Sequence, residues 1–91
     1  MDKLTAAEIN AAVRTVPDWT RRGARLSRTF VFRDFRGAMQ FVRAVARRAE
    51  QAAHHPDILI RWNKVRLTLT THDAGGLTRK DFALARKLDR L

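Results

Sequence analysis

A long stretch of the chain, residues 35–53, carries apolar side chains at the spacing of an amphipathic helix. Asp34 stands just before this stretch and can accept a hydrogen bond from the first backbone amides, so we expect it to cap the helix. The apolar side chains expected on one face are Phe35, Met39, Val42, Ala46 and Ala49, with Phe41 and Val45 widening the stripe. We expect a stripe this broad to contact both a sheet and a second subunit.

Stretches with a period of two flank this helix on both sides. Before it, a short strand around residues 19–22 and a longer one over residues 26–33 are separated by a turn at Gly23. After Pro56, apolar residues alternate again on either side of Asn63-Lys64, the expected turn. The side chains expected to share one face of the third strand are Ile58, Ile60 and Trp62. Each half of the chain is therefore predicted to form a hairpin.

The two ends of the chain carry matching helix starts. Thr5 with Glu8, and Thr78 with Asp81, have the spacing of a capping box. The first helix is expected to end near Arg14, because the proline that follows it lacks an amide proton. The predicted order is α-β-β-α-β-β-α: a single α+β domain over residues 1–91, in which three helices cover one face of a four-stranded antiparallel sheet.

The chain is strongly basic, with 19 Lys and Arg residues against 9 Asp and Glu residues and a formal net charge of +10. Such a balance suggests nucleic-acid binding. The basic residues are nevertheless spread along the chain without a continuous tract, and no recognition motif accompanies them. We therefore do not expect nucleic acid to be the main partner, and we assign most of the surplus charge to solvated surface.

The small size and the absence of cysteine narrow the functions further. A chain of 91 residues buries a modest share of its surface, which favours stabilisation by a partner subunit. Without cysteine there is no thiolate metal site and no Cys nucleophile. No long apolar run and no signal peptide are present in the sequence, so we expect a cytoplasmic protein without a membrane partner.

All three histidines fall close together in the sequence, at His54, His55 and His72. If Asn63-Lys64 is a two-residue turn, Trp62 pairs with Val65, and the same register places His55 opposite His72. A different register would still leave the three imidazoles at the same end of the sheet. We therefore expect them to converge.

Carboxylates are expected beside the histidines. Glu50 precedes His54 by one helical turn and could orient it, and Asp81 lies in the first turn of the last helix, near the same edge. Imidazole can give and take protons near neutral pH, so this set suits general acid–base catalysis. No Ser or Lys has a place in the cluster that would favour covalent catalysis, and Gly75-Gly76 lacks the P-loop pattern.

Other interpretations of these residues stay open. The histidines with their carboxylates could bind Zn²⁺ or Fe²⁺, although adjacent His-His is poor chelating spacing, or they could be purely structural. Asp81 could serve mainly as the capping partner of Thr78, and Glu50 could pair only with a neighbouring arginine. Trp19 could be a core aromatic or could stack on a flat ring.

Three segments of the sequence together form a specific pattern. They are Glu50-x-x-x-His54-His55-Pro56-Asp57, Asn63-Lys64-Val65, and Leu69-Thr70-Thr71-His72-Asp73-Ala74-Gly75-Gly76-Leu77-Thr78-x-x-Asp81-Phe82. This pattern resembles the pterin-4a-carbinolamine dehydratase family. The resemblance extends over nearly the whole chain, including Trp19, the strand with Phe30 and Phe32, and the helix start at Asp34.

The resemblance implies a lyase that removes water from 4a-hydroxytetrahydrobiopterin or a related tetrahydropterin and gives the quinonoid dihydropterin, in cofactor recycling after an aromatic amino-acid hydroxylase. It implies that no cofactor or metal is needed. The residues expected to be catalytic are His54, His55, His72 and Asp81, and those expected to contact the pterin are Trp19, Glu50, Thr70, Thr71 and Asp73.

The resemblance also implies the fold read above, with assembly into dimers or tetramers through the helix over residues 35–53 and through sheet edges. Some members of the family bind a transcription factor and act as dimerisation cofactors. The alternative function is therefore a protein-interaction module with a vestigial pterin pocket.

Overall fold

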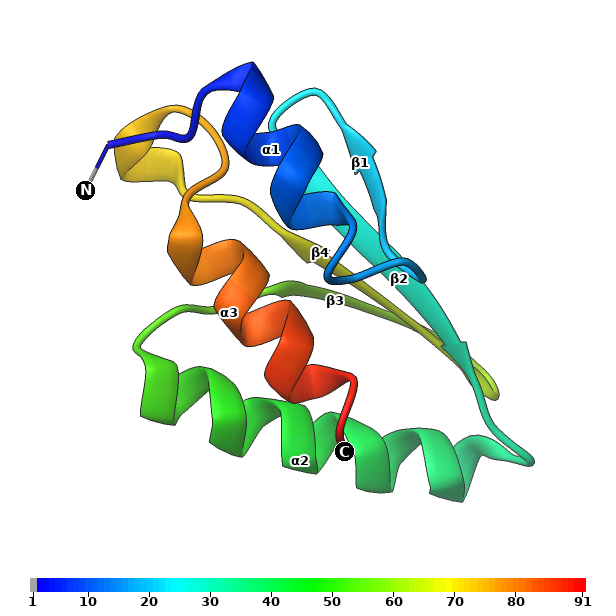
Figure 1. The fold of residues 1–91 in the computed structure, drawn as a ribbon. Helices are drawn as coiled ribbons and strands as arrows, with labels where there is room; N and C mark the ends of the chain where they lie inside the picture. The colour runs from blue at the N-terminus through cyan, green and yellow to red at the C-terminus, as the bar shows by residue number, and fades with distance from the viewer. Residues whose placement is uncertain (1) are drawn as a thin grey trace.

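The structure, a computed structural model, describes residues 2–91 (Figure 1). Its helices are α1 (Ala6–Val13), α2 (Phe35–Ala52) and α3 (Arg79–Leu88), and its strands are β1 (Thr20–Arg22), β2 (Arg25–Val31), β3 (Asp57–Arg61) and β4 (Lys64–Leu69). A short 3₁₀ helix, η1 (His72–Ala74), precedes α3. The predicted order and the antiparallel α+β architecture are confirmed, and Figure 1 shows the three helices on the same side of the sheet. Among residues 2–91, no helix combines the length and the apolar character needed to cross a membrane.

The strands are arranged in the order β1-β2-β4-β3, and all three neighbouring pairs are antiparallel. The central pair, β2 and β4, is brought together although α2 and β3 lie between them in the sequence. Because successive side chains of a strand point to opposite faces, Val65, Leu67 and Leu69 are buried under the helices while Lys64 and Arg66 are exposed.

The turn between β3 and β4 differs from the prediction. Arg61 pairs with Lys64, so the turn residues are Trp62 and Asn63, and the expected pairing of Trp62 with Val65 is wrong. The turn is held by a contact with the residue that follows β2: the amide of Phe32 donates to the Asn63 carbonyl (2.8 Å), and the Asn63 side chain donates back to the Phe32 carbonyl (2.9 Å). Trp62 has left-handed backbone geometry (φ 49°), and it lies outside the strand with 68% of its surface exposed.

The predicted helix caps are confirmed. The hydroxyl of Thr5 accepts from the Glu8 amide, and the Thr5 amide donates to the Glu8 carboxylate, which lowers the pKa of Glu8. Asp34 accepts from the Gly37 amide at 2.8 Å and begins α2. Thr78 and Asp81 form the second capping box at the start of α3.

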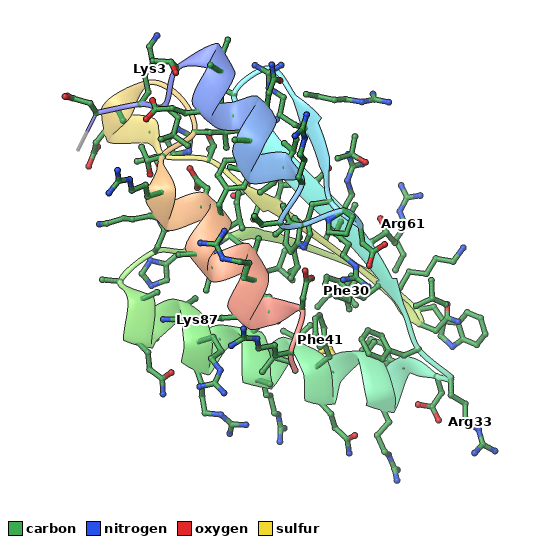
Figure 2. The ribbon with its side chains drawn as sticks, in the orientation of Figure 1. Lys3, Phe30, Arg33, Phe41, Arg61 and Lys87 are labelled. Atoms are coloured by element: carbon green, nitrogen blue, oxygen red, sulfur yellow. The ribbon has the colours of Figure 1, made fainter. Side chains whose placement is uncertain are left out.

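The buried face of α2 is one side of the predicted apolar stripe. Its buried residues are Ala38, Phe41, Val45 and Ala49. Phe41 sets this face because its ring packs on the rings of Phe30 and Phe32, with centroids 4.6 and 4.9 Å away; Figure 2 shows Phe30 and Phe41 together between β2 and α2. Two residues on the other side of the stripe are exposed, Phe35 at 51% and Ala46.

Replacing Leu67 by Ala should lower the free energy of unfolding by about 2–5 kcal/mol, because the side chain is fully buried at the centre of the sheet and would leave a cavity. The matched control is Leu59→Ala in β3, whose residue is 48% exposed and whose truncation should cost less than about 1 kcal/mol. Urea denaturation measures both losses. Equal losses would contradict the assignment of the buried face.

Candidate active site

The centre of the candidate site is a contact between the end of α2 and the start of α3. His54 Nε2 lies 2.6 Å from Asp81 Oδ1. The Asp81 side chain is completely buried, and that of His54 is 11% exposed. The chain reaches this position because α2 ends at Ala52 and Ala53 adopts left-handed geometry (φ 50°), after which the His54 amide still bonds to the Ala49 carbonyl.

The other carboxylate oxygen of Asp81 is also fully engaged. Asp81 Oδ2 accepts from the Thr71 hydroxyl at 2.7 Å and from the Thr78 amide at 2.9 Å, and the hydroxyls of these two threonines are 2.9 Å apart. A carboxylate is an acceptor, so the Nε2–H group of His54 donates to Oδ1. When His54 is neutral, Nδ1 is then the ring nitrogen that can accept a proton.

A second histidine–carboxylate contact lies on the surface. His55 Nε2 and Glu50 Oε2 are hydrogen bonded, and both side chains are mostly exposed, at 63% and 76%. The expectation that Glu50 would orient His54 is therefore wrong. Left-handed Ala53, directly after α2, directs His54 toward α3. His55, the next residue, contacts Glu50 instead.

His72 and Asp73 lie in η1, directly after Thr71, and both are exposed. The predicted pairing of His55 with His72 is wrong, because the ladder between β3 and β4 ends at Asp57 and Thr68 and both histidines lie beyond it. Within residues 2–91, no hydrogen bond joins two imidazoles, and no three His, Asp or Glu side chains are grouped to hold a metal ion. The link between η1 and His54 is indirect, through Thr71 and Asp81.

Two other residues that the sequence singled out point elsewhere. The hydroxyl of Thr70 donates to the Ala24 carbonyl in the β1–β2 turn. Trp19 is buried in the core, where its ring meets Phe30 edge-on and its indole N–H donates to Asp89 at 2.7 Å. Asp89 is the C-cap of α3, eight residues after Asp81 and about 12 Å from it along the helix axis. Trp19 therefore contacts the end of α3 that is opposite to Asp81.

The structure thus brings together five of the predicted site residues in two groups: His54 and Thr71 both contact Asp81, and His55 contacts Glu50. Thr78, which was predicted only to cap the last helix, also contacts Thr71 through its hydroxyl, a contact that was not predicted. The sequence contained a signal for this contact, because Thr71, after a predicted strand, and Thr78, a predicted cap, lie close together in the chain.

Comparison with known proteins identifies the class. The fold and the site define a small α+β protein with histidine–carboxylate pairs at the junction of α2 and α3. The family model described as Pterin 4 alpha carbinolamine dehydratase matches residues 2–91. The chain belongs to the pterin-4a-carbinolamine dehydratase family, which confirms the resemblance found in the sequence.

Relatives and a solved structure support this membership along the full length. A protein of Thermomicrobium roseum is 55% identical over 100% of this chain and 98% of its own length, and one of Chloroflexus aurantiacus is 53% identical over the same shares. Both names assign the proteins, provisionally, to pterin-4-alpha-carbinolamine dehydratase. A crystal structure from Brucella melitensis, described as a transcriptional coactivator/pterin dehydratase, has a TM-score of 0.93 at 35% identity, covering 98% of this chain and 97% of that one.

Replacing Asp81 by Asn tests the assigned hydrogen bonds. The amide oxygen can replace Oδ2, but the amide N–H₂ then faces Nε2, so neutral His54 should move its proton to Nδ1. We expect nitrogen NMR at about pH 8 to show Nε2–H in the parent protein and Nδ1–H in the variant. The exposed Asp73→Asn is the control and should leave the tautomer unchanged. A parent protein with the proton on Nδ1 would contradict the assignment.

Proposed function

We propose that this protein removes water from a 4a-hydroxytetrahydropterin and gives the quinonoid dihydropterin by histidine general acid–base catalysis. The observation that carries the proposal is the contact of His54 with the buried carboxylate of Asp81, which fixes one tautomer and one ring position. The substrate class comes from the family to which the chain belongs.

The reaction needs one proton given and one proton taken. An acid protonates the hydroxyl on C4a, the C4a–O bond breaks, and water leaves. A base takes the proton from N5, and its electron pair completes the C4a–N5 double bond. No electrons are gained or lost overall, so the reaction requires no redox partner. Imidazoles in the two protonation states can divide these steps.

The proposed catalytic imidazoles are those of His54, His55 and His72. His54 can act only through Nδ1 while Asp81 engages Nε2, so Asp81 works as a positioning residue. His55 and His72 are exposed and can be reached by a substrate from solvent. The proposed pterin contacts are Glu50, Thr70, Thr71 and Asp73, and Trp19 stays a prediction from the sequence.

The proposal includes the pathway and the location. The substrate would come from an aromatic amino-acid hydroxylase, the product would return to tetrahydrobiopterin, and both steps would take place in the cytoplasm. These assignments are supported by the family membership alone.

Replacing His54 or His72 by Ala should reduce kcat/KM for a synthetic 4a-hydroxytetrahydropterin by about 10²- to 10⁴-fold, the range expected for loss of one general acid or base. The exposed Gln51→Ala, on the same helix as Glu50, is the control and should retain full activity. The rate is followed by ultraviolet absorbance against the buffer-catalysed reaction. Wild-type protein with no rate above buffer would contradict the proposed function and favour an interaction module.

We propose in addition that copies of the chain associate through α2. The apolar residues beside its buried face, at helical spacing, are Phe35, Met39, Val42 and Ala46. Phe35 and Ala46 are exposed and the other two are partly buried, so this stripe is available to a second copy. Such a surface would also serve the alternative role as an interaction module, and the Brucella melitensis relative is described as a transcriptional coactivator as well as a dehydratase.

Replacing Ala46 by Glu should shift the protein toward the monomer, because a charge would be placed in the middle of this stripe. Gln40→Glu, exposed on the same helix, adds the same charge outside the stripe and should leave the oligomer intact. Sedimentation velocity measures the mass of each species. A monomeric parent protein, or equal dissociation by both variants, would contradict association through this stripe.

A further inference from the structure

The face of the sheet that points away from the helices is strongly basic. The cross-strand pairs place five basic side chains on this open face: Arg22, Arg25, Arg61, Lys64 and Arg66. Asp57, on the edge strand, is the acidic residue that shares it. In Figure 2 the labelled Arg61 extends away from α2. The five residues come from all four strands, so the fold collects charges that are scattered in the sequence.

These charges are not neutralised within the chain. Arg22 lies directly opposite Arg25, and Arg61 lies directly opposite Lys64. Like charges at directly paired positions destabilise a sheet. Within residues 2–91, none of the five forms an ion pair, whereas Arg28 on the covered face binds Asp89 and Asp18. The open face therefore carries an unbalanced positive charge that an anionic partner would relieve.

Two adjoining hollows follow this face. The larger, of about 380 Å³, is lined by Arg22, Arg25, Ser27, Asp57, Ile58, Leu59, Arg66 and Thr68. The smaller, of about 240 Å³, is lined by Thr29, Leu59, Arg61, Lys64 and Arg66. They share Leu59 and Arg66, so together they form one shallow basic groove. Lys64 pairs with Val31, which lies six positions after Arg25 in β2, so the groove is about 20 Å long.

We propose that this open face binds single-stranded nucleic acid, with backbone phosphates along the groove. The guanidinium groups of the groove can bind phosphate oxygens in pairs, and the hydroxyls of Ser27, Thr29 and Thr68 add neutral donors. Trp62, in the turn between Arg61 and Lys64, supplies an exposed ring at one end on which a base can stack. A basic groove joined to an exposed aromatic ring is the arrangement that single strands use.

Two other anionic partners fit the face less well. A membrane surface is bound best by a continuous apolar face beside the basic one, whereas the exposed apolar residues in the strands of this face, Val31 and Leu59, stand singly opposite Lys64 and Arg66. An acidic protein would need carboxylates at fixed positions that match the groove, whereas a nucleic-acid backbone carries phosphate charges at regular intervals over the whole groove length of about 20 Å.

The test compares two triple variants that remove the same charge. The groove variant removes three arginines of the groove (Arg22→Gln/Arg25→Gln/Arg66→Gln). The α2 variant removes three exposed arginines of α2 (Arg36→Gln/Arg43→Gln/Arg47→Gln). Binding of a labelled oligothymidylate of about 20 nucleotides is measured by fluorescence anisotropy over a series of salt concentrations. The groove variant should bind at least ~10-fold more weakly and should lower the steepness of the salt dependence by about 2, and the α2 variant should change neither by a comparable amount.

Trp62→Ala gives a second, independent readout. It should weaken binding of the single strand by about 5- to 100-fold, the cost of one lost stacking contact, without changing the salt dependence. Equal losses in the two triple variants, tighter binding of a duplex of the same length, or binding only to vesicles containing phosphatidylserine would each overturn the proposal.

The proposal does not depend on dehydratase activity. None of the substituted residues is in the proposed catalytic or pterin-binding set, so the groove variant should dehydrate the synthetic pterin at the wild-type rate. Loss of nucleic-acid binding with intact dehydration is the expected result. A wild-type protein that dehydrates the pterin and binds no single strand would overturn this inference alone.

Discussion

The buried carboxylate of Asp81 joins the ends of α2 and β4 to the start of α3. Through Oδ2 it caps α3 and binds Thr71 after the end of β4, and through Oδ1 it contacts His54 after the end of α2. An ionised carboxylate is costly to bury unless its oxygens are hydrogen bonded, so these donors are required together. The position of His54 relative to η1 therefore depends on the same interaction that begins α3.

A second aspartate fastens the opposite end of α3. Asp89 is the C-terminal cap, a position where the helix dipole disfavours negative charge. Arg28 and the Trp19 indole both donate to Asp89 Oδ1 at 2.7 Å, and this offsets the unfavourable position. Asp81 thus ties α3 to α2 and β4, while Asp89 ties it to β2 and to the segment before β1. With both ends fixed, the angle of α3 across the sheet is defined. Trp19 contributes to this through its hydrogen bond to Asp89.

The features that the sequence predicted are those that depend on near neighbours. The capping boxes at Thr5 and Thr78, the cap at Asp34 and the alternation in β2 and β4 involve residues a few positions apart, and all were confirmed. The errors arose from long-range contacts. Bonds between Phe32 and Asn63 fix the β3–β4 turn, and the bond of His54 to Asp81, after left-handed Ala53, leaves Glu50 to contact His55. None of these contacts has a local signal.

The distribution of charge on the sheet follows from the alternation of side chains along its strands. A period of two in a one-sided sheet requires apolar residues toward the helices, and it leaves the opposite face free to carry any polar residue. A face selected for stability alone would place opposite charges in directly paired positions, and this sheet places arginine opposite arginine and arginine opposite lysine. The contact of His54 with Asp81 belongs to the helix side and the basic groove to the other side. The β4 backbone is shared by both, and because its side chains alternate between the faces, each surface can change without altering the other.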